Sequence, residues 1–117
     1  MKTKELLRKL LKALLRVAFR VYYRTIDVRG MDRFPNDGPV LLVANHPNSL
    51  LDPAMLVHVL PRPVTFGAKH TLFRGAFLRS ILQIFGAIPL VRAADDPRGM
   101  GKNVVAFERY AELLRAR

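Results

Sequence analysis

The chain has 117 residues, of which 50% are hydrophobic, and it carries a formal net charge of +11 at pH 7. It contains no cysteine, which excludes a disulfide framework and catalysis by a thiol. A chain of this length can bury roughly two-thirds of its unfolded surface, enough for one small core, and its excess of positive charge favours an anionic membrane surface or nucleic acid as partner.

Residues 1–24 are predicted to form a basic amphipathic helix. Leucines and valines occupy one side of its helical projection, and Leu15, Phe19 and Tyr23 interrupt the polar side. Two arginines break the longest apolar run, so the segment lacks the roughly 20 uncharged residues that cross a bilayer. The helix is therefore expected to lie on an anionic membrane surface. The basic residues at every fourth position are Lys4, Arg8, Lys12, Arg16, Arg20 and Arg24.

Other interpretations of this helix are a surface helix packed on its own domain, a nucleic-acid-binding element and a secretion signal. Nucleic-acid binding would favour aromatic residues interleaved with basic ones on a sheet, whereas Phe19, Tyr22 and Tyr23 lie among leucines. A secretion signal would need an uninterrupted apolar core and a small-residue cleavage site. We therefore expect no nucleic-acid partner and a peripheral membrane location, on the cytoplasmic face.

Residues 25–117 are predicted to form one domain in which strands alternate with helices. That alternation is typical of an α/β layer fold. The expected elements are a strand at 25–29, a turn at 34–39, a strand at 40–44, a short helix from 54, a strand at 64–68, a helix at 77–85 closed by Gly86, a strand at 88–91 and a helix at 103–114.

The turn after the second predicted strand carries a histidine and a carboxylate. Pro47 favours an extended conformation for His46 at the strand end, and Asp52 before Pro53 is typical of a helix N-cap. If the turn folds back, Asp52 can orient the His46 ring while the second ring nitrogen faces a substrate, which is the arrangement of a general base and its orienting carboxylate. A capping device without catalytic function explains the same residues.

Two other kinds of chemistry find little support in the sequence. His58 and His70 show no ligand-like spacing with His46, so no metal site is expected. Ser49 is not surrounded by the glycines of a nucleophile elbow.

Two basic residues adjoin later predicted strands. Arg92 ends the strand at 88–91, and a guanidinium suits bidentate binding of a phosphate. Lys69 follows the strand at 64–68 and can guide an anionic ligand. A surface arginine and a loop lysine are the alternatives.

These motifs resemble the glycerolipid acyltransferases, which acylate glycerol 3-phosphate and lysophosphatidic acid. The resemblance spans approximately residues 26–110. It implies an acyltransferase layer fold with His46 as base, Asp52 as its partner, and Asn45, Lys69 and Arg92 in substrate binding. It also implies an acyl-CoA or acyl carrier protein thioester as co-substrate and no bound cofactor. The segments that carry the resemblance are Asn45-His46, Asp52-Pro53, Phe66-Gly67-Ala68-Lys69, Leu72-Phe73 and Gly86-Ala87-Ile88-Pro89-Leu90-Val91-Arg92.

The sequence departs from the family pattern at two points. Five residues separate His46 from Asp52, where four are commonest in the family. The family's third motif, Phe-Pro-Glu-Gly, and its fourth are absent from these residues. We therefore expect the N-terminal portion of an acyltransferase domain, with little or no activity from these residues alone.

Two functions follow as expectations. The first is acyl transfer to a hydroxyl of glycerol 3-phosphate or a lysophospholipid in phospholipid biosynthesis, as in a 1-acylglycerol-3-phosphate O-acyltransferase. The second is a membrane-surface binding module without catalysis, which uses the same N-terminal helix and needs none of the absent motifs.

Overall fold

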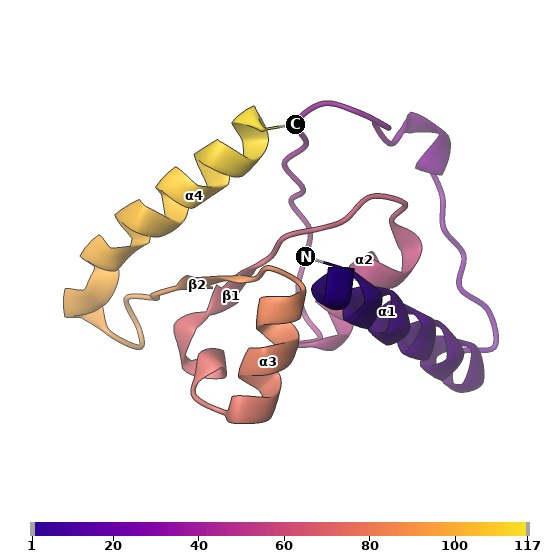
Figure 1. Ribbon diagram of the computed structural model, residues 1–117, viewed down its shortest axis with the longest axis horizontal. Coiled ribbons are helices and arrows are strands. Elements are labelled where there is room, and N and C mark those ends of the chain that lie inside the picture. Colours follow the sequence, from indigo (N-terminus) through magenta and orange to yellow (C-terminus); the bar gives the residue numbers. More distant parts are fainter. Residues whose placement is uncertain (1, 117) are drawn as a thin grey trace. The chain divides into compact units, whose positions relative to one another are not determined.

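The computed structural model describes residues 2–116 and combines helices with a small parallel sheet (Figure 1). This mixture is compatible with the predicted α/β class. Residues 1 and 117, which the two predicted domains include, lie outside the described residues. The helices and strands are α1 (Lys2–Tyr22), α2 (Leu51–Val59), β1 (Gly67–Lys69), α3 (Ala76–Ile84), β2 (Ile88–Leu90) and α4 (Asn103–Arg115). Short 3-10 turns cover Met31–Arg33, His70–Phe73 and Pro97–Lys102.

The backbone forms two compact units. The first takes in the described residues up to Asn36 together with Leu42–Val64, and the second takes in Asp37–Leu41 and the described residues from Thr65 onward. Within residues 2–116, no helix combines the length and apolar character that crossing a membrane requires.

The first unit is built by α1 packing on α2. Phe19 of α1 is buried, and its ring centroid lies 5.2 Å from that of His58 on α2. The Lys12 ammonium donates a hydrogen bond of 3.0 Å to the carbonyl oxygen of Leu60, which ties α1 to the C-terminal end of α2. Phe19, which interrupts the polar side of the predicted helix, thus provides the contact that holds α1 in its unit.

A second side of α1 is apolar and exposed to solvent. At 100° per residue its members fall on one stripe of the helix, away from Phe19. Because these side chains are exposed, the stripe lies outside the core of the unit. They are Leu6, Leu7, Leu10, Leu14, Val17 and Val21, with exposed fractions between 41% and 82%.

The second unit is built around β1 and β2, which pair in parallel. Gly67 pairs with Ile88 and Lys69 with Leu90. Parallel neighbours need a crossover connection, and α3 supplies it, so the segment forms a β-α-β unit (Figure 1). Gly86 ends α3 in the left-handed conformation, φ 70°, as the sequence predicts, and lets the chain turn into β2.

The core of this unit lies where β2 meets the start of α4. Phe85, Ile88, Val91 and Ala106 are buried there. The buried side chain of Asn103 accepts a hydrogen bond from the Val91 backbone N–H and donates one to the Val91 carbonyl oxygen, each 2.8 Å long. Asn103 thus provides hydrogen-bond partners for the N–H and C=O groups of Val91, just beyond the end of β2, as a neighbouring strand would.

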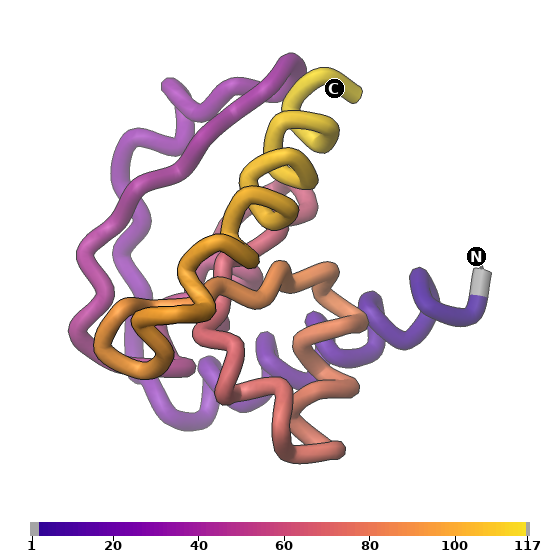
Figure 2. The backbone as a smooth tube through the Cα atoms, turned by 90° about the vertical axis from the view of Figure 1, so that its left-hand side faces the viewer, coloured from indigo at the N-terminus to yellow at the C-terminus, as the bar shows by residue number. Residues whose placement is uncertain are grey.

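Two predicted strands are wrong. Residues 25–29 and 40–44 are extended but belong to no ladder within the described chain (Figure 2). Their β-branched residues favour extended backbone, but a strand also needs a neighbour to satisfy its N–H and C=O groups. Without one, Leu41 and Val43 remain 75% and 90% exposed. The strand predicted at 64–68 is also displaced, because pairing begins at Gly67 and ends at Lys69.

Candidate active site

His46 and Asp52 come together in the turn that leads into α2. Nδ1 of His46 lies 3.0 Å from Oδ2 of Asp52. The His46 side chain is 59% exposed and that of Asp52 is 24% exposed, so the ring reaches solvent while the carboxylate is partly covered. The contact expected from the sequence therefore forms, with the histidine on the outer side of the turn.

Asp52 also holds the turn closed. Oδ2 accepts the Asn48 backbone N–H at 2.8 Å, and Oδ1 accepts the Asn48 side-chain amide at 3.3 Å. The bond from the Asn48 backbone, and secondarily the His46 side chain, lower the pKa of the Asp52 carboxyl. An ionised carboxylate can only accept hydrogen bonds, so Nδ1 of His46 must donate. In the neutral tautomer with the proton on Nδ1, Nε2 carries the lone pair and can act as a base.

The predicted capping function of Asp52 is wrong. The N-cap of α2 is Leu50, which has no side-chain cap, and Asp52 is the second residue of the helix. Its carboxylate points back to Asn48 and His46 because the turn is folded over the first turn of α2. A carboxylate here also suits the positive end of the helix dipole.

The extra residue of this turn is accommodated by Ser49. Its φ of 44° is in the left-handed region, which residues other than glycine rarely adopt. The following Leu51 N–H donates to the Asn48 carbonyl oxygen at 2.9 Å, which fixes the turn. The left-handed residue therefore lets a separation of five residues bring His46 and Asp52 into contact.

Asn45 precedes His46 and is exposed. In the part of the chain that the structure describes, its side chain makes no hydrogen bond. Its amide is therefore available to a ligand from the same turn as the His46 ring.

Lys69 and Arg92 come together in the second unit, through Asp95. The Lys69 ammonium lies 2.9 Å from Oδ1 of Asp95, and Nε of Arg92 lies 2.7 Å from Oδ2. Lys69 ends β1 and Arg92 follows β2, so the parallel pairing puts both at the same edge of the sheet.

Asp95 is a component of this cluster that the sequence interpretation missed. Its side chain is only 18% exposed. Hydrogen bonds from Arg92 and then from Lys69 lower its pKa to about 2, and the same contact raises the pKa of Arg92. The available signal was its position three residues after Arg92, in the segment between the strand predicted at 88–91 and the helix predicted at 103–114. Asp95 is thus ionised across the neutral range and holds both cations.

No metal centre is formed by the described residues. Within 2–116, no three histidine, aspartate or glutamate side chains are grouped so that they could hold one ion. The arrangement in each unit is instead a polar cluster on a turn or a strand edge. The first unit provides a base with an orienting carboxylate, and the second provides paired cations.

Comparison with known proteins gives these clusters a context. The family model named Acyltransferase matches residues 25–117. An uncharacterized acyltransferase of Schizosaccharomyces pombe is 37% identical over 95 aligned residues, covering 74% of this chain and 14% of the relative. This chain therefore spans about a seventh of the length of that relative. No solved structure matches it. Since the family model covers most of the chain, including His46, Asp52 and Arg92, the chain belongs to the acyltransferase family.

Proposed function

We propose that this chain takes part in the transfer of a fatty acyl group from a thioester to a hydroxyl of glycerol 3-phosphate or a lysophospholipid, in phospholipid biosynthesis. The observation that carries the proposal is the 3.0 Å contact between His46 Nδ1 and Asp52 Oδ2. It fits a base in which one ring nitrogen is fixed by a carboxylate and the other is left for the substrate. The donor is an acyl-CoA or acyl carrier protein thioester.

The proposed reaction begins at Nε2 of His46. This nitrogen takes the proton of the acceptor hydroxyl as the hydroxyl oxygen attacks the thioester carbonyl carbon. The tetrahedral intermediate then collapses, the carbon–sulfur bond breaks, and the thiolate leaves with the proton returned by His46. Asp52 stabilises the imidazolium formed between these steps, and the products are an ester and a free thiol.

Lys69 and Arg92 are proposed to bind the acceptor phosphate. Their contacts with Asp95 support this, because the carboxylate holds two cationic side chains at one sheet edge. A guanidinium binds phosphate in a bidentate manner and an ammonium adds a point charge. Asn45 is proposed to bind the substrate from the turn that carries His46.

The fold of this chain is proposed to be the N-terminal part of the glycerolipid acyltransferase layer fold. The β-α-β unit with a cationic edge is compatible with the glycerolipid acyltransferase layer fold. The family match covers residues 25–117, and the helix before it is proposed as a peripheral anchor on an anionic membrane. Its exposed apolar stripe, with basic residues beside it, supports this location.

The test is an acyl-transfer assay that compares the native protein with its variants. His46→Ala is expected to reduce kcat by roughly 10²- to 10⁴-fold, the range for a positioned general base. Asp52→Asn is expected to reduce kcat similarly, because an amide that donates to Nδ1 leaves Nε2 protonated.

The matched control is His58→Phe, which removes another histidine of the first unit and keeps a ring against Phe19. It is expected to leave kcat within about twofold of the native value. Circular dichroism shows whether each variant is folded. Full turnover by a folded His46→Ala variant contradicts the assignment of the base.

A further inference from the structure

A cavity in the first unit is lined by three arginines. Its volume is about 320 Å³, and its lining comes from the C-terminal half of α1, the residues that follow α1, and α2. Arg16, Arg20 and Arg24 supply the charge. None of the described residues that line the cavity is acidic, so its charge is positive only. The other lining residues are Phe19, Tyr23, Thr25, Ile26 and His58.

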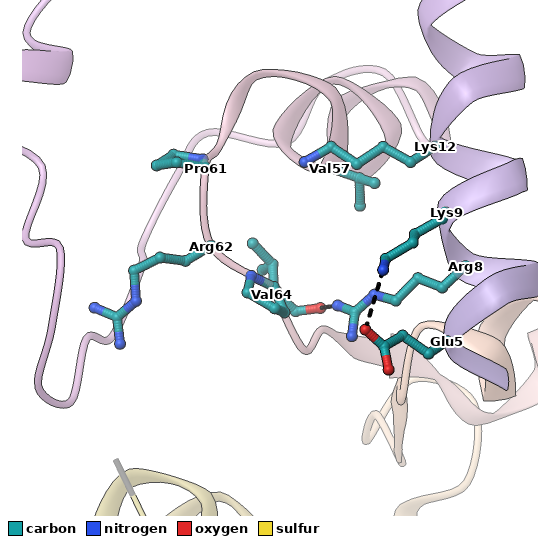
Figure 3. Close-up of a pocket in the computed structure, with 9 residues that line it drawn as sticks. Glu5, Arg8, Lys9, Lys12, Val57, Pro61, Arg62 and Val64 are labelled. Atoms are coloured by element: carbon teal, nitrogen blue, oxygen red, sulfur yellow. Dashed lines mark hydrogen bonds and ion pairs between the residues drawn. The ribbon is translucent and has the colours of Figure 1, made fainter. Parts of the chain in front are cut away.

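The basic residues in the N-terminal half of α1 are engaged within the chain. The Lys9 ammonium lies 3.3 Å from Glu5, and a guanidinium nitrogen of Arg8 lies 3.5 Å from the Val64 carbonyl oxygen (Figure 3). Lys12 donates to a backbone carbonyl oxygen at the end of α2. These cations therefore serve the packing of the unit.

The three arginines of the cavity are not used in this way. Among the described residues, Arg16, Arg20 and Arg24 make no hydrogen bond and no ion pair with one another or with any other side chain or backbone group. All three are exposed. Their N–H donors are therefore open to a ligand from outside the chain.

The four-residue spacing of the basic residues explains this difference. Four residues advance about 400° around a helix, so each basic residue is turned about 40° from the one before it. Lys12 is thus about 20° from Phe19, on the side that packs on α2, whereas Arg20 is about 60° from Val17 of the exposed apolar stripe. The arginines of the cavity therefore lie on the flank of α1, between its packed side and the stripe.

Positive charge is in excess around the cavity. The C-terminal end of α1 carries roughly half of a negative elementary charge, which offsets only part of one arginine. Asp27, which follows the last lining residue, lies 2.7 Å from Arg29. Burial first, and then the charges of Arg16 and Lys12, lower the pKa of the His58 imidazole. An anion held between the arginines would therefore relieve repulsion among like charges.

The chemistry and the position of the cavity favour the phosphate of a lipid. A guanidinium matches two phosphate oxygens with paired N–H donors. An interfacial helix sits at the boundary between headgroups and acyl chains, so a flank beside the apolar stripe is at headgroup level. Tyr23, with an apolar ring and a polar hydroxyl, suits the same boundary. A soluble phosphate would make no use of the neighbouring stripe.

We propose that this cavity binds the phosphate of an anionic phospholipid headgroup through Arg16 and Arg20, with Arg24 as a third ligand. The bound headgroup fixes the rotation of α1 about its own axis on the membrane. Neither His46 nor Asp52 lines the cavity, so the site is separate from the proposed base. This proposal rests on the proposed membrane location, because it names the lipid group that α1 contacts.

Binding of a monomeric short-chain lipid to the full chain tests the site without a membrane. Dihexanoyl phosphatidylglycerol is titrated calorimetrically below its micelle concentration. Arg16→Gln with Arg20→Gln is expected to weaken binding by about tenfold or more, because charge-assisted hydrogen bonds are lost. Lys4→Gln with Lys9→Gln is the matched control, since it removes the same charge from the same helix outside the cavity. It is expected to change the affinity by no more than about twofold, and equal losses in the two variants overturn the proposal.

Two further arms distinguish recognition of a lipid phosphate from other anion binding. Arg16→Lys with Arg20→Lys keeps both charges but loses the paired donors, and is expected to weaken binding by about threefold or more. Unchanged affinity in this variant overturns the proposal, because charge alone would then suffice. Inorganic phosphate is expected to bind about tenfold or more weakly than the lipid. Phosphate that binds as tightly as the lipid identifies a site for a soluble anion and also overturns the proposal.

Nuclear magnetic resonance locates the bound lipid. The ring signals of His58, which lines the cavity, are expected to shift as dihexanoyl phosphatidylglycerol binds. Those of His70, in the second unit, are expected to stay in place. A saturated chain in which the His58 signals have not moved contradicts the site.

Flotation with phosphatidylglycerol vesicles separates this proposal from the proposed function. A native chain that floats, with short-chain lipid binding that is indifferent to Arg16→Gln and Arg20→Gln, refutes the headgroup site and keeps the membrane location. A chain that binds the short-chain lipid through these arginines but does not float refutes the membrane location alone. His46→Ala is expected to lower kcat and leave lipid binding intact, so failure of the base is recognised independently.

Discussion

Ser49 has a left-handed backbone conformation that its side chain disfavours, φ 44°. Serine tolerates this region better than a β-branched residue, which crowds the backbone there. The turn depends on this conformation because Ser49 lies between Asn48 and Asp52. The Asp52 carboxylate accepts the Asn48 backbone N–H and contacts the His46 ring, and both contacts require the chain to reverse at Ser49.

We therefore expect Ser49→Val to lower the free energy of unfolding by roughly 1–2 kcal/mol and to reduce acyl transfer. Ser49→Gly is the matched control and is expected to keep both, since glycine adopts positive φ readily. Thermal unfolding and kcat are measured on the same preparations. A fully active and stable Ser49→Val variant would show that the turn does not need this conformation.

Asn103 acts at the residue scale in the second unit, since one side chain satisfies two backbone groups. Asn103→Leu leaves the Val91 N–H and carbonyl oxygen buried without their partner. Each such group costs about 1–3 kcal/mol, so chemical denaturation should show a loss of at least that size. Asn103→Asp keeps the acceptor but loses the donor, so its free energy of unfolding is expected to lie between those of the native chain and the leucine variant. Equal stability of the leucine variant would contradict the bridging function.

At the scale of the elements, Asp95 joins the ends of β1 and β2 through its ion pairs with Lys69 and Arg92. Its pKa in the folded chain is about 2, against an ordinary value of 3.8. A lowered folded pKa means that the unfolded chain binds the proton more readily, so the ion pairs stabilise the fold above about pH 4 and are lost as the pH falls toward 2.

Asp95→Asn is therefore expected to lower the Tm at neutral pH, and the difference from the native chain should narrow between about pH 4 and pH 2. Melting curves across this range, monitored by circular dichroism, measure it. Glu108→Gln, an exposed carboxylate in the same unit, serves as control and should show no such narrowing. A Tm difference that is constant with pH would show that Asp95 does not stabilise the fold through its ionised carboxylate.

Elements that depend on interactions between residues close in sequence are predicted correctly, whereas elements that need a partner far away in the sequence are not. The helices at 77–85 and 103–114 are encoded in local periodicity and in Gly86, and the structure has them as α3 and α4 within a residue or two. The contact between His46 and Asp52 also follows from one short turn. The prediction of a strand at 40–44 is wrong because the local sequence cannot specify a second strand to pair with it. Asn103 was missed for the same reason, since its partner Val91 is fixed only by the fold. Asp95 has one local partner, Arg92, but its second partner, Lys69, is brought close only by the pairing of β1 with β2.

At the scale of the whole molecule, the stripe of α1 is an apolar surface that remains exposed to solvent in the described chain. Leu10→Gln with Leu14→Gln is expected to reduce flotation with anionic vesicles about tenfold or more, because each buried leucine contributes roughly 1.5–3 kcal/mol. The control is Val104→Gln with Val105→Gln on α4, which are also exposed. Undiminished flotation of the leucine variant would contradict the proposed membrane location.

The packing of α1 has a consequence for where chemistry can occur. Phe19 faces α2, while the leucines face the opposite way. A helix with its side chains is about 10 Å thick, so α1 resting on lipid would act as a spacer that sets the height of α2 above the surface. His46 would then stand at a fixed elevation, and an acceptor would have to lift its hydroxyl out of the headgroup layer to meet it. Reach from the membrane, as well as shape, would then select the substrate.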